Sequence, residues 1–110
     1  MKMHARFSFL ALGLAAIAAA VADEPISYAE GARLMAKYNC QTCHALDKKS
    51  AGPSLREIAK RYASVPTAAI QLESKVVNGS TGAWGPIPMP PSNVPQEDLQ
   101  KLVEWTLSLR

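Results

Sequence analysis

Hydrophobic and polar positions alternate with helical spacing in four parts of the chain, approximately residues 27–38, 54–62, 66–78 and 95–109. Within each part, apolar side chains recur three and four residues apart, which places them on one face of a helix. Two of these parts open with Ser-x-x-Glu, at Ser27 and Ser54, a pattern that predicts a capping box. No stretch has the alternation of a strand. The pattern therefore predicts an all-α domain of about four helices.

A stiff loop is predicted between the third and fourth helices. Residues 84–91 read Trp-Gly-Pro-Ile-Pro-Met-Pro-Pro, with four prolines in six residues. Proline removes the amide that a helix needs and favours extended backbone. Asn78-Gly79 predicts a left-handed stop to the third helix. Met89 thus lies in the middle of a loop that has little conformational freedom.

The first 22 residues have the layout of a secretory signal peptide. Lys2 and Arg6 precede an apolar run over 7–20, and the small-residue pattern Ala20-Val21-Ala22 follows. The apolar run is shorter than the roughly 20 residues that a membrane-spanning helix needs. We expect cleavage after Ala22, which leaves residues 23–110 as one mature domain without a membrane span.

The net charge of the chain indicates no particular binding partner. Twelve Lys and Arg face nine Asp and Glu, a net charge of +3, and loss of Lys2 and Arg6 with the leader lowers it by two. Lys48-Lys49 and Lys60-Arg61 are isolated pairs rather than a basic stripe, so we expect no nucleic-acid partner. A domain this short buries a modest core and often depends on a covalent or cofactor staple.

Both cysteines of the chain and one of its two histidines stand together in Cys40-Gln41-Thr42-Cys43-His44. C-x-x-C-H is the attachment sequence of c-type haem. Two thiols at this spacing can bond to the two vinyl-derived carbons on one haem edge, which leaves the next residue beneath the iron. The motif predicts covalent haem on Cys40 and Cys43, with His44 as the proximal ligand.

Three other uses of the motif are less consistent with the sequence. A thioredoxin-like redox pair would follow a strand, and no strand pattern precedes Cys40. A structural zinc site needs four ligands, and the only further Cys or His is His4, in the segment expected to be removed. A disulfide across two residues would be strained and would close almost no loop.

The iron needs a sixth ligand, and the mature chain offers Met35 and Met89. Met35 lies on the inward face of the first predicted helix, where methionine is an ordinary core filler. Met89 has no helical face, and prolines on both sides restrict its backbone, which reduces the entropy lost on binding. We expect Met89 to be the distal ligand. Histidine–methionine ligation raises the reduction potential and suits electron transfer.

Two further residues are candidates for contact with the haem site. A ligating histidine usually gives its other ring proton to a carbonyl, and the carbonyl of Pro53 is the candidate acceptor for His44. The indole N–H of Trp84 needs a partner when buried, and either ordinary core packing or a haem propionate can explain this residue.

The mature chain resembles the class I bacterial c-type cytochromes, most closely the cytochrome c-551 (cytochrome c8) group. The resemblance is carried by Cys40-Gln41-Thr42-Cys43-His44, Gly52-Pro53, Asn78-Gly79-Ser80 and residues 84–91. It implies about four helices around one covalently attached haem c, with the terminal helices crossing at Gly31 and Trp105. It also implies that Met89 binds the iron, that Pro53 accepts from the proximal histidine, and that Trp84 contacts a propionate.

The chain departs from the pattern it resembles at three positions. Ser92 stands where close relatives place an asparagine that supports the methionine sulfur. Lys75 stands where they carry an arginine near the propionates, and lysine lacks the bidentate fork of arginine. Met35 replaces an aromatic residue. These differences concern the tuning of the reduction potential.

The resemblance implies an electron carrier of the periplasm that docks briefly on a redox donor and then an acceptor, and we expect this carrier to be a monomer. The acceptor would be a nitrite reductase, a terminal oxidase or a peroxidase. The alternatives are a haem enzyme subunit and a ligand-binding haem sensor. An enzyme would need a distal acid or base, and the mature chain has no second histidine. A sensor would need an open sixth position, which a stiff Met89 loop disfavours.

Overall fold

The computed structural model describes residues 1–3, 10–17 and 24–110, and the helices all lie in the last of these ranges. They are α1 (Tyr28–Lys37), η1 (a 3₁₀ turn, Cys40–Thr42), α2 (Leu55–Arg61), α3 (Ala68–Asn78) and α4 (Gln96–Ser108). Among the described residues there is no strand, only an isolated bridge between Ser80 and Met89. The all-α prediction and its four helices are confirmed. The 3₁₀ turn over the cysteine motif was not predicted.

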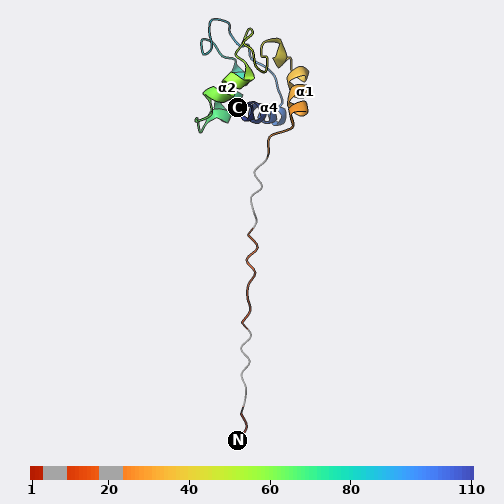
Figure 1. Ribbon diagram of the computed structural model, residues 1–110, viewed down its shortest axis with the longest axis vertical. Helices are drawn as coiled ribbons and strands as arrows, with labels where there is room; N and C mark the ends of the chain where they lie inside the picture. The colour runs from red at the N-terminus through yellow and green to blue at the C-terminus, as the bar shows by residue number, and fades with distance from the viewer. Residues whose placement is uncertain (4–9, 18–23) are drawn as a thin grey trace.

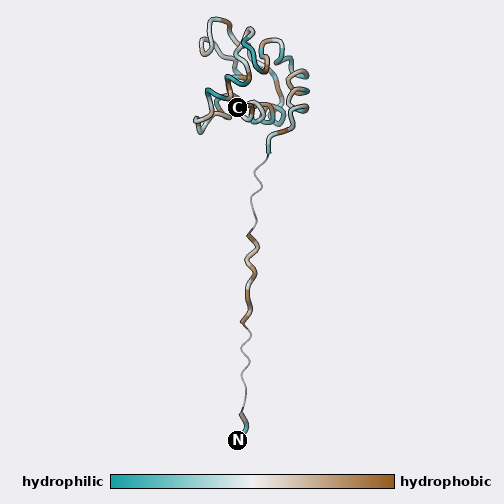
Figure 2. The backbone as a smooth tube through the Cα atoms, in the orientation of Figure 1, coloured by the Kyte–Doolittle hydropathy of each residue, from teal (hydrophilic) through white to brown (hydrophobic). Residues whose placement is uncertain are grey.

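The described residues of the proposed leader, 1–3 and 10–17, are drawn apart from this helical body (Figure 1). Residues 10–17 are hydrophobic (Figure 2), and Leu14 is 93% exposed. Residues 18–23, which include the expected cleavage point after Ala22, lie outside the described residues, so the signal peptide stays a prediction. Among the residues that are described, no helix combines the length and apolar character required to span a membrane.

Two serines start helices, but only one completes the predicted capping box. Ser54 accepts from the amide of Glu57, and the Glu57 carboxylate accepts from the amide of Ser54. Ser27 accepts from the amide of Glu30 at 3.2 Å, but the Glu30 carboxylate turns to Arg33, with Oε1 and Nη2 2.7 Å apart. The full box predicted at Ser27 is therefore wrong, because a charged partner one turn along the helix competes for the carboxylate.

Helix α4 is the centre of the body and packs against α1, α2 and α3. It lies between α1 and α2 in Figure 1. The most deeply buried core side chains are Leu34 of α1 and Leu99 of α4, at 0% and 1% exposure. Packing on a single central helix means that the position of α4 determines how the other three are arranged.

The crossing of α1 and α4 depends on one residue without a side chain. A Cβ atom added at Gly31 would overlap the indole of Trp105. Trp105 is 3% exposed and also meets the edge of the Tyr28 ring, with ring centroids 5.9 Å apart at 63°. The crossing expected between Gly31 and Trp105 is therefore present.

A second contact fastens the far end of α1 to the start of α4. Tyr38, which follows α1, donates its hydroxyl hydrogen bond to the carboxylate of Asp98 in the first turn of α4. The Lys37 ammonium lies 3.5 Å from the same carboxylate. The hydrogen bond from Tyr38, with the positive charge of Lys37, lowers the pKa of Asp98 below its ordinary value of 3.8.

Gly31→Ala tests the close crossing. Helix propensity alone would favour alanine by about 1 kcal/mol, but overlap with Trp105 should destabilise the fold by about 1–3 kcal/mol. Ala32→Gly, at an exposed neighbouring position, is the matched control and should cost only the propensity difference. Urea denaturation of both variants decides the point. A stabilising Gly31→Ala substitution would contradict close packing.

Tyr38→Phe tests the contact between α1 and α4 through its pH dependence. A carboxyl group with a lowered pKa stabilises the folded state above its ordinary pKa, and this contribution is lost as pH falls through the lowered value. The wild type should therefore be more stable than Tyr38→Phe at neutral pH, and the difference should shrink well below pH 3.8. Denaturant midpoints at both pH values measure it. Tyr28→Phe, which removes an exposed hydroxyl, should show no such change.

Candidate haem site

A cavity of about 210 Å³ lies inside the helical body. One water needs only about 10–15 Å³ of such space, so the cavity has room for a much larger ligand. All four α-helices contribute apolar wall residues, which include Met35, Leu55, Ile58, Leu72, Val76, Leu99, Leu102 and Val103. Leu72 and Val76 of α3 are only half-buried, because they border this cavity. Several core side chains therefore serve as walls of the site.

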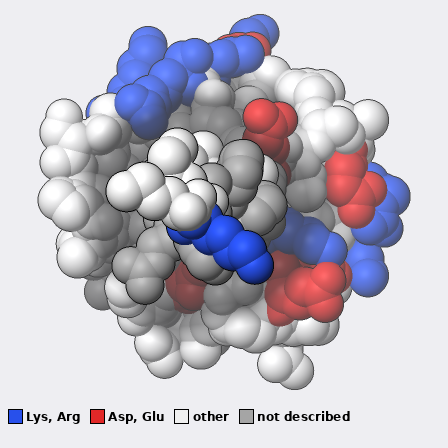
Figure 3. All heavy atoms as spheres, turned by 90° about the horizontal axis from the view of Figure 1, so that it is seen from below, with Lys and Arg blue, Asp and Glu red and all other residues white. Residues whose placement is uncertain are grey.

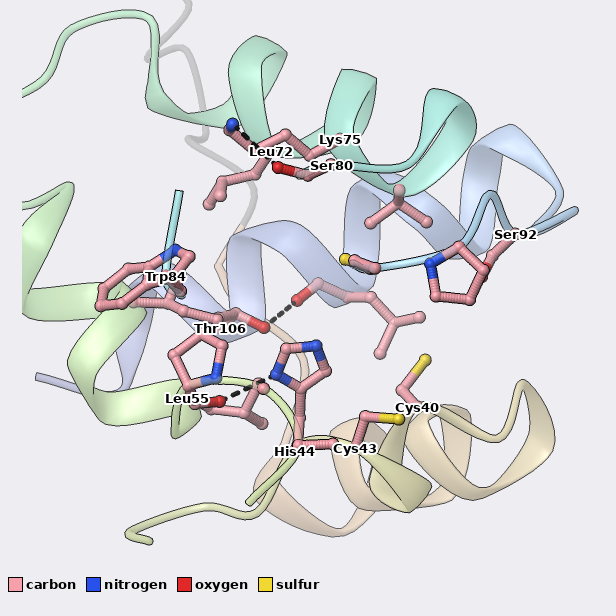
Figure 4. Close-up of a pocket in the computed structure, with 18 of the residues that line it drawn as sticks. Cys40, Cys43, His44, Leu55, Leu72, Lys75, Ser80, Trp84, Ser92 and Thr106 are labelled. Carbon is pink, nitrogen blue, oxygen red and sulfur yellow. Dashed lines mark hydrogen bonds between the residues drawn. The ribbon is translucent and has the colours of Figure 1, made fainter. Parts of the chain in front are cut away.

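The cysteine motif forms one side of the cavity. Asn39 takes the left-handed conformation (φ 58°), which asparagine tolerates better than most residues, and the 3₁₀ turn follows it. The Cys40 carbonyl then accepts from the amides of Cys43 and His44, at 3.2 and 3.0 Å. This tight turn brings both thiols and the imidazole to the same side of the cavity (Figure 4).

The His44 ring is held in one orientation. Its Nδ1 lies 2.8 Å from the carbonyl oxygen of Pro53. A carbonyl only accepts, so Nδ1 is the donor in this hydrogen bond, and Nε2 is the ring nitrogen left to face the cavity. A Cβ atom at Gly52 would lie 2.6 Å from Cε1 of the ring, so a side chain there would displace the imidazole. Gly52 and Pro53 together hold the His44 ring so that Nε2 is available to bind a metal.

Met89 lies on the same cavity, although the loop that carries it is far from His44 in sequence. Its backbone pairs with Ser80 through two hydrogen bonds of 2.8 and 2.9 Å. Gly79 has φ of 77°, and a Cβ atom there would lie 2.7 Å from the Met89 carbonyl oxygen. Gly79 thus ends α3 and also lets residues 80–89, the methionine loop, fold back so that Met89 lies against Gly79.

Trp84 and Lys75 also line the cavity. In Figure 4, Lys75 and Ser80 lie across the cavity from His44, with Trp84 at one edge and Ser92 at the other. The Lys75 ammonium donates to the Ser80 hydroxyl at 3.4 Å. Within the described ranges, the indole N–H of Trp84 has no hydrogen-bond partner. The polar groups at this border are therefore a cation and an available donor, a combination suited to an anionic group.

The donor set fits a covalently attached haem. Cys40 and Cys43 are unpaired, half-buried thiols, and burial raises the pKa of the Cys40 thiol. They stand beside an imidazole with a free Nε2, and the thioether of Met89 shares the cavity. In the part of the chain that the structure describes, no three His, Cys, Asp or Glu residues are grouped so as to hold a bare metal ion.

Two contributions to the site were not predicted from the sequence. Ser80 belongs to one of the motifs that carry the resemblance, but its backbone pairing with Met89 was not expected. Arg61 stacks on Trp84, with its Cζ 4.2 Å from the ring centroid, although it looked like half of an isolated basic pair. Both are contacts between segments that are distant in sequence, which local patterns do not encode.

The fold and this donor set are those of a small all-α protein whose paired cysteines and neighbouring histidine suit the attachment of a haem. A family model described as cytochrome c matches residues 28–110. The chain therefore belongs to the cytochrome c family, small electron carriers that bind haem c.

Known relatives agree with this assignment. The chain is 43% identical over 95 residues to cytochrome c-551 of Stutzerimonas stutzeri, which covers 86% of this chain and 91% of that protein. It is 45% identical over 80 residues to cytochrome c-552 of Nitrosomonas europaea, which covers 72% and 78%. The crystal structure of wild-type Nitrosomonas europaea cytochrome c552 superimposes with a TM-score of 0.69 at 45% identity, over 72% of this chain and 99% of that one.

Proposed function

We propose that this chain is a monomeric periplasmic electron shuttle that carries one haem c. The observation that carries the proposal is the cavity itself, on which Cys40, Cys43 and His44 meet Met89. Cleavage of the leader after Ala22 would release residues 23–110 as the mature carrier. Its acceptor would be a nitrite reductase, a terminal oxidase or a peroxidase, by resemblance to the cytochrome c-551 group.

Each residue has a definite part in holding the cofactor. Cys40 and Cys43 would form the two thioether bonds, and His44 Nε2 and the Met89 sulfur would be the axial ligands. When bound, the haem supplies the ferric–ferrous couple. The Pro53 carbonyl, which accepts from His44 Nδ1, keeps the ring in place.

The polar residues at the border of the cavity would bind the haem propionates. Trp84 offers an indole N–H, and Lys75 offers a positive charge without a bidentate fork. Ser92 is tied through its amide to the Val76 carbonyl at 2.8 Å, which anchors the chain just beyond the methionine loop. Ser92 stands where, by resemblance, relatives carry an asparagine that supports the methionine sulfur. In this chain the Ser92 backbone is held by its hydrogen bond to Val76.

Electron exchange requires a small surface that docks briefly. Ile87, in the loop that carries Met89, is 61% exposed and lines the cavity. Lys48 and Lys49 follow the cysteine motif and have no ion-pair partner in the described part of the chain. An apolar contact with charged residues at its border suits a weak, electrostatically steered encounter. On the face in Figure 3, acidic and basic groups lie side by side at the right, and basic groups gather at the upper left.

Covalent haem is tested first, because every other assignment depends on it. The full chain, expressed with its leader and purified from the periplasm, should give the alkaline pyridine spectrum of thioether-linked haem and no free thiol. Cys40→Ser should leave a single thioether and shift that spectrum, because one vinyl group stays unsaturated. Haem that acid–acetone extracts from the wild type would overturn the proposed function.

Met89→Ala tests the distal ligand and the carrier function together. Loss of the thioether should abolish the sulfur-to-iron charge-transfer band, lower the reduction potential and allow carbon monoxide to bind the reduced protein. Met35→Leu, a similar-sized change on the cavity wall, should keep the band. If the band survives in Met89→Ala, another residue is the ligand. Carbon monoxide binding to the reduced wild type would instead support a sensor.

A further inference from the structure

The loop between Ser80 and Met89 is closed at its base but has few ties at its tip. Two backbone hydrogen bonds between these residues close the base. Across the described ranges of the chain, only one hydrogen bond joins residues 81–88 to the rest of the protein. It runs from Nη1 of Arg61 to the carbonyl oxygen of Ala83, at 2.9 Å. Among the described residues, the Arg61 side chain thus makes the only hydrogen bond to the tip of the loop.

Arg61 makes a second contact with the same part of the loop. Its guanidinium lies over the Trp84 ring, with Cζ 4.2 Å from the ring centroid. A planar guanidinium can stack on an indole and donate to the adjacent carbonyl at the same time, whereas a lysine ammonium lacks this planar fork. Arg61 has no acidic partner in the described part of the chain, so its interactions are directed to this loop.

The two residues differ in their relation to the cavity. Trp84 lines it, and Arg61 does not. Arg61 is the last residue of α2, whose Ile58 and Leu55 are also cavity walls, so its backbone is fixed relative to the site. The guanidinium therefore connects a rigid wall of the cavity to the residue that borders its edge.

We propose that Arg61 is a positioning residue that latches the tip of the methionine loop to α2 and holds Trp84 at the edge of the haem cavity. The proposal rests on the proposed function and adds a residue that the haem-attachment motif does not reveal. With the latch closed, the indole N–H stays directed to the site and water is kept from the cavity edge. With the latch open, the tip moves without disturbing the base at Ser80 and Met89.

Arg61→Gln and Arg61→Lys test the latch in the holoprotein. Hydrogen exchange at the Trp84 indole, followed by NMR, should be about tenfold faster or more in Arg61→Gln, because a charge-assisted hydrogen bond and a cation–π contact are both lost. Trp105, which is 3% exposed, is the internal reference and should not change. Arg61→Lys should also accelerate Trp84 exchange, since it keeps the charge but loses the planar fork.

The reduction potential shows whether Arg61 acts by positioning Trp84 or only through its positive charge. Arg61→Lys should lower the potential, because greater access of water to the haem favours the more charged oxidised form. Lys60→Gln removes the neighbouring exposed charge and should change neither the potential nor the exchange of Trp84. Wild-type exchange of Trp84 in both Arg61 variants would overturn the latch, as would an equal shift of potential in Lys60→Gln.

Failure of the latch is distinguishable from failure of the proposed function. All Arg61 variants should retain the pyridine spectrum of covalent haem and the sulfur-to-iron band. Normal haem with unchanged Trp84 exchange would refute the latch alone. A wild type without covalent haem would refute both.

Discussion

The contact between Gly31 and Trp105 determines the geometry on which the site depends. Because α4 also packs against α2 and α3, the close crossing of α1 on α4 positions α1 relative to the whole body. The cysteine motif follows α1 almost at once, and Tyr38 ties that end of the helix to Asp98. The thiols and the imidazole therefore reach the cavity because the terminal helices meet without an intervening side chain.

Core and cofactor site share the same side chains in this short chain. Leu99, Leu102 and Val103 are buried in the core and also line the cavity. A haem bound there adds apolar contacts that the chain alone cannot make, and a ligand that binds only the folded state stabilises it. Folding and cofactor retention are therefore linked through these residues.

An electron carrier works best when its ligands barely move between redox states, and the structure restrains both sides of the site by local means. His44 is oriented by the Pro53 carbonyl and confined by Gly52. Met89 is fixed by its backbone pairing with Ser80 and by the prolines beside it. The two glycines that permit these close approaches are Gly52, beside the His44 ring, and Gly79, beside the Met89 carbonyl oxygen.

Sequence alone determined the four helices, the cavity-facing motif and the candidate ligands, because helical spacing, capping residues and C-x-x-C-H are local patterns. Sequence analysis did not predict contacts in which a side chain has several possible partners in the folded structure. The Ser27 box is incomplete because Arg33 competes for Glu30. The roles of Ser80 and Arg61 arise only when α2, the turn after α3 and the methionine loop come together. Local sequence patterns therefore determined the helices and the candidate ligands. Packing between segments that are distant in sequence determined which side chains support the site.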